Sequence, residues 1–495
     1  MKEEKKQSLL ASFINYIGVI LGALSTFFIY PKNLELYGIY GFLTNAASIL
    51  TPFVTLGFGT VLLRYFPFFK NHEEKNHGFL AFIFVGYLVG IVIFILCFVL
   101  LLPIIKNYYT VDSKNSVFLI FILPLTILYV LFDLFTHYCI NYRKLVVPTL
   151  LNALLKLYLP VIFLATIGGI LNYMSFIILV CLYYIVIIIV IVIYIYSANL
   201  LHVQIRKQIF SHALVPQMVR FALFSILTGV SSLIALRIDS VMVTFALGVE
   251  ENGKFILAAF ISNAVYIPAN SISDILFPRV ANLSKDSDKL GLLQIYQKSM
   301  INMLIPTLWI GLCTYLSFPY LTQLMPNTEK VSTISLCLAF LLLARLIDAG
   351  TGVNHHILAF SKFYRIEMYL MLCMAFINVS LNYFFIPIFG IAGAALATFI
   401  SVSLFNVAKS VIVFWNLGLH PFTLRIIYLL AAVPIVFFIN SLLPDTGSMV
   451  VNIILHCSSV SLILFGFIVY FKISPELIQL ISQNINLGLG RIKDS

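Results

Sequence analysis

Charged residues occur inside several long apolar segments of the sequence. Arg237 and Asp239 stand two positions apart in ALRIDSVMV, and Lys156 lies about 15 Å into another apolar run if each residue adds 1.5 Å of helix rise. A charge at mid-membrane costs about 2.5–3.5 kcal/mol on insertion scales, so such residues usually face a cavity or a partner. Guanidinium groups bind phosphate through two parallel hydrogen bonds, and lysine supplies a point charge. The basic residues therefore predict a site for an anion.

Three further basic residues complete the set of candidates for binding a diphosphate or lining a cavity. Arg345 lies in the inner half of its apolar segment, whereas Arg64 and Arg279 lie at segment ends, where snorkelling also explains them. The alternative role of Arg345 is to neutralise Asp348, because Asp348 is three residues away and residues i and i+3 meet on one helix face. Lys156 has no acid within four residues, which favours a cavity role.

The acidic residues Asp133, Asp239 and Asp348 are candidates for ion coupling, because a buried carboxyl group can take up a proton or a sodium ion. Pairing with the basic residues is the alternative role, and the one that we favour. Arg237 and Asp239 are about 200° apart around a helix and need separate partners. We expect Arg237 to meet the phosphate, and Asp239 to meet protein or an ion.

The remaining polar residues in apolar segments point to structure rather than chemistry. Adjacent side chains diverge on a helix, so His355 and His356 do not predict a metal site. Asn378, Asn382 and Asn406 are expected to form hydrogen bonds between helices. The seven cysteines include no C-x-x-C pair, which argues against a zinc or redox site. We expect no catalytic residues, no metal and no cofactor.

The elements that carry these residues are predicted to be transmembrane helices. Hydrophobic residues make up 61% of the 495 residues and charged residues only 10%, against about 25% charged in soluble domains. The apolar residues form runs of about 20, the length that spans a bilayer core. The fold class is therefore an all-α polytopic membrane protein. Fourteen spans are predicted: Leu9–Tyr30, Ile39–Leu63, Phe79–Leu102, Phe118–Tyr138, Val146–Ile167, Met174–Tyr196, Met218–Leu247, Phe255–Phe277, Ile301–Phe318, Val331–Thr351, Met368–Ile388, Ile391–Phe414, Leu424–Leu443 and Val450–Phe471.

The distribution of basic residues predicts the orientation. With the N-terminus inside, 22 of the 30 Lys and Arg residues, Lys409 among them, fall on the cytoplasmic side, 5 fall outside and 3 lie in the membrane. This bias places both termini in the cytoplasm. It also explains the net charge of +11 without nucleic acid as a partner. The opening MKEEKKQ has no small-residue cleavage site, so we expect a retained first helix.

The chain contains a faint internal repeat. At an offset of 215, Gly38 aligns with Gly253 and Arg64 with Arg279. The offset corresponds to six spans, and an even number gives two copies of the same orientation, as in parallel-repeat transporters whose substrate site lies between the halves. The predicted parts are an N-lobe with helices 1–6 (1–212), a C-lobe with helices 7–12 (213–418), and helices 13–14 with a cytoplasmic tail (419–495).

Several segments resemble the Wzx-type polysaccharide flippases, which belong to the multidrug/oligosaccharidyl-lipid/polysaccharide exporter superfamily. Residues 237–286, from RIDSVMVTFALG to PRVANLSKD, are similar to the seventh and eighth helices of that family. LNYFFIPIFGIAGAALATFIS (381–401) is similar to its eleventh-to-twelfth helix junction, and LGFGTVLLRYFP (56–67) to the end of its second helix. The likeness covers nearly the whole chain.

The resemblance implies a function and a location. Such a protein moves an undecaprenyl-diphosphate-linked oligosaccharide from the cytoplasmic to the periplasmic leaflet of the bacterial plasma (inner) membrane, for O-antigen, capsule or exopolysaccharide synthesis. It implies two lobes around a central cavity that work by alternating access. H⁺ and Na⁺ are the candidate coupling ions, and a polysaccharide polymerase and a chain-length regulator are the candidate protein partners.

Three alternatives remain open from the sequence. A peptidoglycan-precursor flippase handles similar chemistry and is not separated by charge. A cation-coupled multidrug exporter of the same superfamily is less favoured, because cationic drugs favour acids over bases in the cavity. A polytopic enzyme of polysaccharide assembly is least favoured, since the sequence has no large periplasmic loop. We therefore expect a transporter and not an enzyme.

Overall fold

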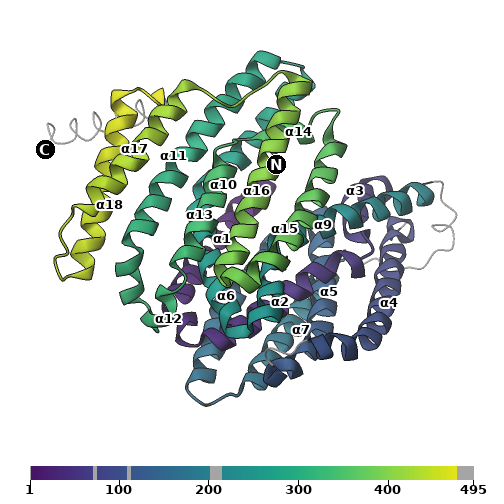
Figure 1. Cartoon of the computed structure of the whole chain (residues 1–495). Coiled ribbons are helices and arrows are strands. Elements are labelled where there is room, and N and C mark those ends of the chain that lie inside the picture. Colours follow the sequence, from purple (N-terminus) through teal and green to yellow (C-terminus); the bar gives the residue numbers. More distant parts are fainter. Residues whose placement is uncertain (1, 71–74, 109–112, 201–213, 476–495) are drawn as a thin grey trace, which may run out of the picture. The chain divides into compact units, whose positions relative to one another are not determined.

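The computed structural model describes residues 2–70, 75–108, 113–200 and 214–475, and these residues fold into helices joined by short connections (Figure 1). No strand occurs within these ranges. Helices are the expected solution because a membrane offers no water to the backbone, and a helix satisfies its own N–H and C=O groups. The predicted all-α polytopic fold is confirmed.

The chain divides into two compact units. Unit 1 comprises 1–257 and 379–391, and unit 2 comprises 258–378 and 392–495. The predicted lobes follow the sequence repeat instead and stay a prediction. The predicted lobe boundary at residue 212 and the last 20 residues of the predicted cytoplasmic tail (476–495) lie outside the described residues.

Unit 1 contains the first eight long helices. They are α1 (Lys2–Phe28), α2 (Leu34–Val54), α3 (Phe58–Phe69), α4 (Phe79–Tyr108), α5 (Ile122–Asn141), α6 (Val146–Ile167), α7 (Tyr173–Ser197) and α9 (Val215–Leu247). Short 3-10 turns lie at Tyr30–Lys32, Lys75–Gly78 and Ser113–Phe121. The unit also takes the start of α10 (Val249–Lys285) and the end of α15 (Tyr364–Phe389). Within it, α2 packs along α9 and α5, and α1 packs along α6.

Unit 2 contains the remaining parts of α10 and α15 together with the later helices. These are α11 (Lys289–Leu321), α12 (Thr328–Ser332), α13 (Ser335–Ala349), α14 (Asn354–Ala359), α16 (Ile391–Leu417), α17 (Leu424–Ser441) and α18 (Met449–Tyr470), with a 3-10 turn at Thr322–Leu324. Helices α11, α17 and α18 lie side by side (Figure 1). They share a core that includes Leu308, Ala432 and Val460.

The fourteen predicted spans correspond to helices of the structure, although not every helix is a complete apolar span. Eleven helices in the described part of the chain are long and apolar enough to cross a membrane, or 12 if α2 and α3 form one bent span. The two other predicted spans correspond to α1, whose apolar part is the short Ile17–Lys32, and to the 15-residue α13. The long seventh span is one continuous 33-residue helix, α9.

The second predicted span is broken at Gly57. Helices α2 and α3 meet there at an angle of 51°. Gly57 has a φ of 73°, and a Cβ atom on it would lie 2.1 Å from the Ala222 carbonyl oxygen of α9. Only glycine fits this combination of left-handed backbone and close approach. The break therefore directs α3, which carries Arg64, away from the axis of α2.

The two glycines that the repeat aligns pack against the same helix crossing. A Cβ atom on Gly38 of α2 would lie 1.7 Å from the Val249 carbonyl oxygen, and one on Gly253 of α10 would lie 2.0 Å from the Leu34 carbonyl oxygen. Small residues of this kind let helix backbones approach closely in membranes. The repeat thus places equivalent glycines face to face, and the close crossing brings the polar side chains of α2, α9 and α10 together.

Candidate functional site

Arg237 is held in unit 1 by a chain of neutral polar groups. Its Nη1 donates to Asn45 Oδ1 at 2.7 Å, and Asn45 Nδ2 donates to Ser240 Oγ at 2.9 Å. Ser240 donates to Asn252 Oδ1 at 2.8 Å, and Asn252 Nδ2 donates to the Gly38 carbonyl oxygen at 3.0 Å. The guanidinium group is exposed at the end of this chain. An amide oxygen orients the guanidinium without cancelling its charge.

Asp239 lies on the opposite side of α9 from Arg237 and has a different partner. Its carboxylate is 4% exposed and accepts a 2.6 Å hydrogen bond from Asn382 Nδ2 on α15. Asn382 also lines a groove of about 590 Å³ between α9 and α15. The prediction that Arg237 and Asp239 need separate partners is confirmed. Asn382 therefore both donates to the carboxylate and lines the groove.

Tyrosines surround the Arg237 guanidinium within unit 1. The hydroxyl groups of Tyr40 and Tyr129 lie within electrostatic range of Arg237. The Tyr129 ring packs on Tyr184 with centroids 4.9 Å apart. Aromatic rings with polar tips provide apolar faces and hydroxyl groups in one place. The surroundings of Arg237 can therefore contact both a charged group and a ring-shaped neutral group such as a sugar.

Lys156 of α6 lies against two glycines of α1. A Cβ atom on Gly18 would be 3.4 Å from Lys156 Nζ, and one on Gly22 would be 3.8 Å from its Cδ. The absence of side chains at these positions leaves room for the lysine. Lys156 is only partly buried and forms no ion pair with any residue that the structure describes. Its charge therefore remains available.

Arg64 of α3 and Asp133 of α5 have local partners in unit 1. The Arg64 guanidinium stacks over the Phe221 ring of α9 at 4.3 Å and is exposed. The Oδ2 atom of Asp133 on α5 lies 3.1 Å from Nδ1 of His137, one turn further on. A Cβ atom on Gly59 of α3 would lie 3.2 Å from the Asp133 carboxylate. Asp133 thus belongs to a contact between α3 and α5.

Arg345 and Asp348 of α13, in unit 2, also bind asparagines. Arg345 Nη2 donates to Asn263 Oδ1 of α10, and its guanidinium lies 5.6 Å from the centre of the Tyr266 ring. Asp348 Oδ1 accepts from Asn406 Nδ2 of α16 at 3.1 Å. Arg345, Asp239 and Asp348 thus each have an asparagine partner on another helix. Lys409 also lies within electrostatic range of Asp348. The expected pairing of acids with basic residues, including that of Arg345 with Asp348, stays a prediction.

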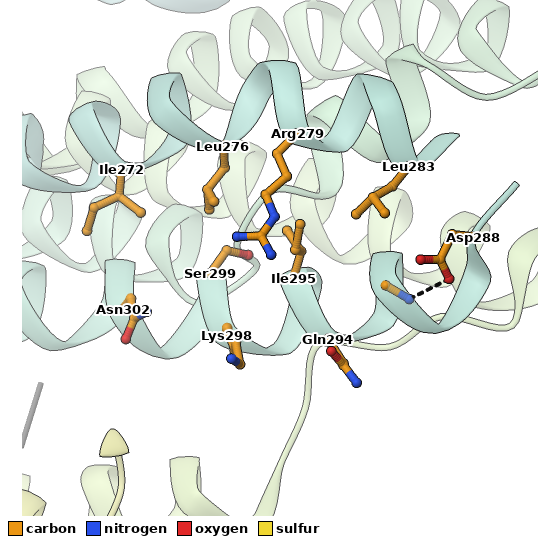
Figure 2. A pocket seen from close by; sticks show the side chains of 11 residues that line it. Ile272, Leu276, Arg279, Leu283, Asp288, Gln294, Ile295, Lys298, Ser299 and Asn302 are labelled. Carbon is orange, nitrogen blue, oxygen red and sulfur yellow. Dashed lines mark hydrogen bonds between the residues drawn. The ribbon is translucent and has the colours of Figure 1, made fainter. Parts of the chain in front are cut away.

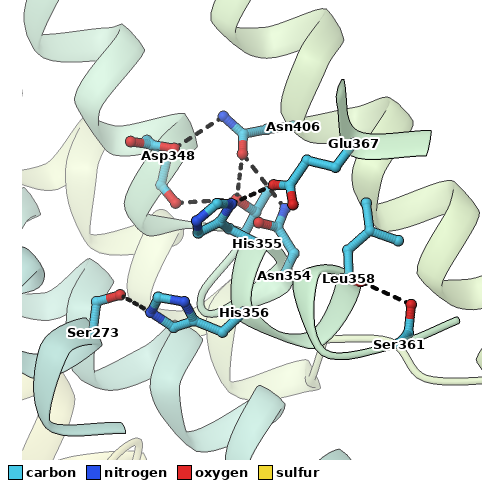
Figure 3. A network of polar contacts seen from close by, with 10 residues as sticks. Ser273, Asp348, Asn354, His355, His356, Leu358, Ser361, Glu367 and Asn406 are labelled. Carbon is cyan, nitrogen blue, oxygen red and sulfur yellow. Dashed lines mark hydrogen bonds and ion pairs between the residues drawn. The ribbon is translucent and has the colours of Figure 1, made fainter. Parts of the chain in front are cut away.

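Asn406 is the centre of a polar network in unit 2 (Figure 3). Besides donating to Asp348, its Oδ1 accepts from Thr351 Oγ1 at 3.1 Å and from Asn354 Nδ2 at 3.4 Å. The expectation that Asn382 and Asn406 form hydrogen bonds between helices is confirmed. Lys409, one turn further along α16, is 4% exposed. The sequence placed Lys409 on the cytoplasmic side, and the structure buries it.

The adjacent histidines of α14 point to different partners (Figure 3). His355 contacts the carboxylate of Glu367, and His356 Nε2 lies 2.8 Å from Ser273 Oγ. Glu367, Asn45 and Asn263 are among the polar residues that sequence reasoning passed over. A signal existed for the two asparagines, because both are polar residues inside apolar segments.

Arg279 belongs to unit 2. It is exposed on α10 and lines a pocket of about 310 Å³ that α10 and α11 form (Figure 2). Within unit 1 the structure thus brings Arg237, Asp239 and their amide partners onto one helix crossing. Within unit 2 it brings Arg345 and Asp348 onto one turn of α13, with Arg279 near the α10–α11 turn.

Comparisons with known proteins agree with this architecture. The sequence model of a family described as polysaccharide biosynthesis protein matches residues 8–284, more than half of the chain. A comparison with curated protein sequences finds no match.

Solved transporter structures share the fold. The inward closed conformation of lipid II flippase MurJ is 14% identical, with a TM-score of 0.72, over 94% of this chain and 98% of that one. An inward-facing multidrug resistance MATE transporter is 12% identical, with a TM-score of 0.61, over 83% and 94%. A MOP superfamily transporter from Pyrococcus furiosus is 12% identical, with a TM-score of 0.51, over 83% and 93%. At these identities the likeness shows the fold alone.

Proposed function

The chain belongs to the polysaccharide biosynthesis protein family, and on this premise we propose that it is a lipid-linked oligosaccharide flippase. It moves an undecaprenyl-diphosphate-linked glycan repeat unit from the cytoplasmic to the outer leaflet of the bacterial plasma membrane, with both termini in the cytoplasm. One observation carries the proposal. The guanidinium groups of Arg237 and Arg345 are each held by an asparagine, and neither forms an ion pair with a carboxylate among the residues that the structure describes.

Because the asparagine partner is neutral, the positive charge of the guanidinium group remains available to bind the transported lipid. A carboxylate partner would cancel most of that charge, and an anion would have to displace it. An amide oxygen uses one N–H group of the fork and leaves others to bind phosphate oxygens in pairs. Lys156, which has no ion pair among the described residues, supplies a further charge in the same way.

Each basic residue is proposed to contact the diphosphate at a different step of alternating access. Arg64 and Arg279 meet the diphosphate at the cytoplasmic side, Lys156 and Arg345 hold it, and Arg237 receives it toward the outer side. A negative cell interior assists the exit of an anion by about 2.3 kcal/mol per charge per 100 mV. The tyrosines near Arg237 offer contacts for sugar rings.

A peptidoglycan-precursor flippase is the second candidate, because the fold extends over 94% of this chain in a lipid II flippase and the passenger chemistry is shared. Export of cationic drugs fits less well, because the basic residues would repel such a substrate. The three possibilities differ in the cargo and can be separated by supplying each one.

We expect the purified protein in liposomes to move a fluorescent undecaprenyl-diphosphate oligosaccharide between leaflets. The measurement is the fraction of label that an external quencher reaches with time. Empty liposomes and liposomes with an unrelated membrane protein are the controls. Movement of lipid II alone would select the second candidate. Transport of a cationic dye without movement of either lipid would contradict both flippase assignments.

We further propose that Asp239 binds the coupling ion, H⁺ or Na⁺, with Asp133 and Asp348 as the other candidates. Replacing Asp239 with asparagine keeps an oxygen that accepts from Asn382 but removes the charge. We expect the variant to retain its thermal stability in detergent and to lose the acceleration of flipping by a proton or sodium gradient. Equal acceleration in Asp239→Asn and wild type would show that Asp239 has only a structural role.

A further inference from the structure

The pocket between α10 and α11 is lined by both polar and apolar side chains. Arg279 extends from α10 toward α11 (Figure 2). Gln294, Lys298 and Asn302 contribute polar side chains from α11, whereas Leu276 belongs to the apolar wall on α10. The volume of about 310 Å³ is large enough for a phosphate group with its nearest neighbours.

The sequence predicts that the pocket lies near the ends of two apolar segments. The apolar segments predicted from the sequence are 255–277 and 301–318, so Arg279 and Lys298 lie just outside the apolar part of each helix. The turn between the helices carries the charged residues Lys285, Asp288 and Lys289. Basic side chains at this level meet the phosphates of the lipid headgroups.

The Arg279 guanidinium group is accessible to an anion. Arg279 is exposed and has neither a hydrogen bond nor an ion pair with any residue in the described ranges. Asp288 is the one acid among the residues that line the pocket, and it caps α11 by accepting from the Gly291 N–H at 2.9 Å. The net charge of the lining is therefore positive.

A second, smaller pocket adjoins the first. It measures about 120 Å³ and is also lined by Lys298 and Asn302, with Arg425 from the start of α17 on its other side. Lys298 thus stands between two further basic residues, Arg279 and Arg425. Three cations around one turn of α11 attract a group with more than one negative oxygen.

We propose that these residues bind the phosphate headgroup of a membrane lipid. Arg279 and Lys298 hold the phosphate oxygens, and Ile272 and Leu276 contact the first methylene groups of the lipid chain. The apolar wall favours a lipid over a free phosphate ion, because a soluble anion gains nothing from apolar contact. If the bound lipid is the lipid that the protein transports, the inference rests on the proposed function.

Equilibrium binding tests this site without transport, so its failure is distinct from a failure of the flippase assay. Native mass spectrometry would measure binding of phosphatidylglycerol, undecaprenyl diphosphate, diacylglycerol and inorganic pyrophosphate to the full-length protein. We compare wild type, Arg279→Gln, Lys298→Gln and the double variant. Lys285→Gln, on the same hairpin and outside the pocket, is the matched control, and thermal melting verifies that each variant is folded.

We expect at least one phosphate-bearing lipid to bind and the double variant to bind it at least about tenfold more weakly, because charge-assisted hydrogen bonds are lost. Lys285→Gln should bind as wild type does. A preference for undecaprenyl diphosphate would identify the passenger, and a preference for phosphatidylglycerol would identify a bilayer lipid. Equal binding by the folded double variant, equal binding of diacylglycerol, or equally tight binding of free pyrophosphate would each overturn the proposal.

Discussion

Replacing Arg237 with alanine is expected to abolish export of the glycan lipid while the protein stays folded in the membrane. The side chain is exposed, and its hydrogen-bond partner Asn45 keeps a second hydrogen bond to Ser240, so little stability is lost. The passenger loses charge-assisted hydrogen bonds worth about 1.5–3 kcal/mol each, or about 10- to 150-fold in rate if they form in the transition state. The flipping rate in liposomes and the surface glycan of cells measure the effect.

Two further variants serve as controls. One tests whether the paired hydrogen bonds of the guanidinium group matter beyond its positive charge, and the other tests whether loss of any exposed arginine from α9 has the same effect. Arg237→Lys keeps the charge but not the paired hydrogen bonds, and we expect intermediate flipping. Arg220→Ala removes an exposed arginine from the same helix, α9, and should leave export at the wild-type level. Normal export by Arg237→Ala would contradict the role of the guanidinium group in binding the diphosphate.

Replacing Lys156 with methionine is expected to abolish export and at the same time to make the protein more stable. Methionine has nearly the length of lysine and fits beside Gly18 and Gly22, so the packing of α1 on α6 is kept. Removing a mid-membrane charge avoids an insertion cost of about 2.5–3.5 kcal/mol. Flipping in liposomes and thermal melting in detergent should therefore change in opposite directions.

This pair of opposite changes distinguishes a functional lysine from a structural one. If Lys156 stabilised the fold, Lys156→Met would lower the melting temperature along with export. Lys144→Met, in the connection before α6, is the control for loss of a basic residue and should retain export. Wild-type export by Lys156→Met would rule out a contact between Lys156 and the diphosphate.

The asparagine partners give the two units a common design. Arg237 and Asp239 in unit 1, and Arg345 and Asp348 in unit 2, each bind an amide on another helix. A buried ion pair would hold its charges in a fixed state and would have to be broken before either partner could bind a ligand. Amides are neutral and offer both a donor and an acceptor. They can therefore form a hydrogen bond with an arginine or with a carboxylate without neutralising its charge.

The sequence by itself determined the membrane class, the helical segments and the identity of the unusual charges. Hydropathy is a property of local composition, and a bilayer accepts only segments whose backbone hydrogen bonds are internal, so the position of each apolar run predicts a helix. The repeat identified Gly38 and Gly253, which the structure then placed on one helix crossing. The i,i+2 spacing of Arg237 and Asp239 was enough to predict separate partners.

Only the tertiary structure decided which groups those charges meet. The partners Asn45, Asn263 and Asn382 lie on other helices, and the rotation of each helix about its axis fixes which side chains face one another. The spacing of Arg345 and Asp348 along α13 does not reveal their asparagine partners, which lie on α10 and α16. Lys409 shows the same limit: it lies near a span end in sequence, but the packing of α16 in unit 2 buries it.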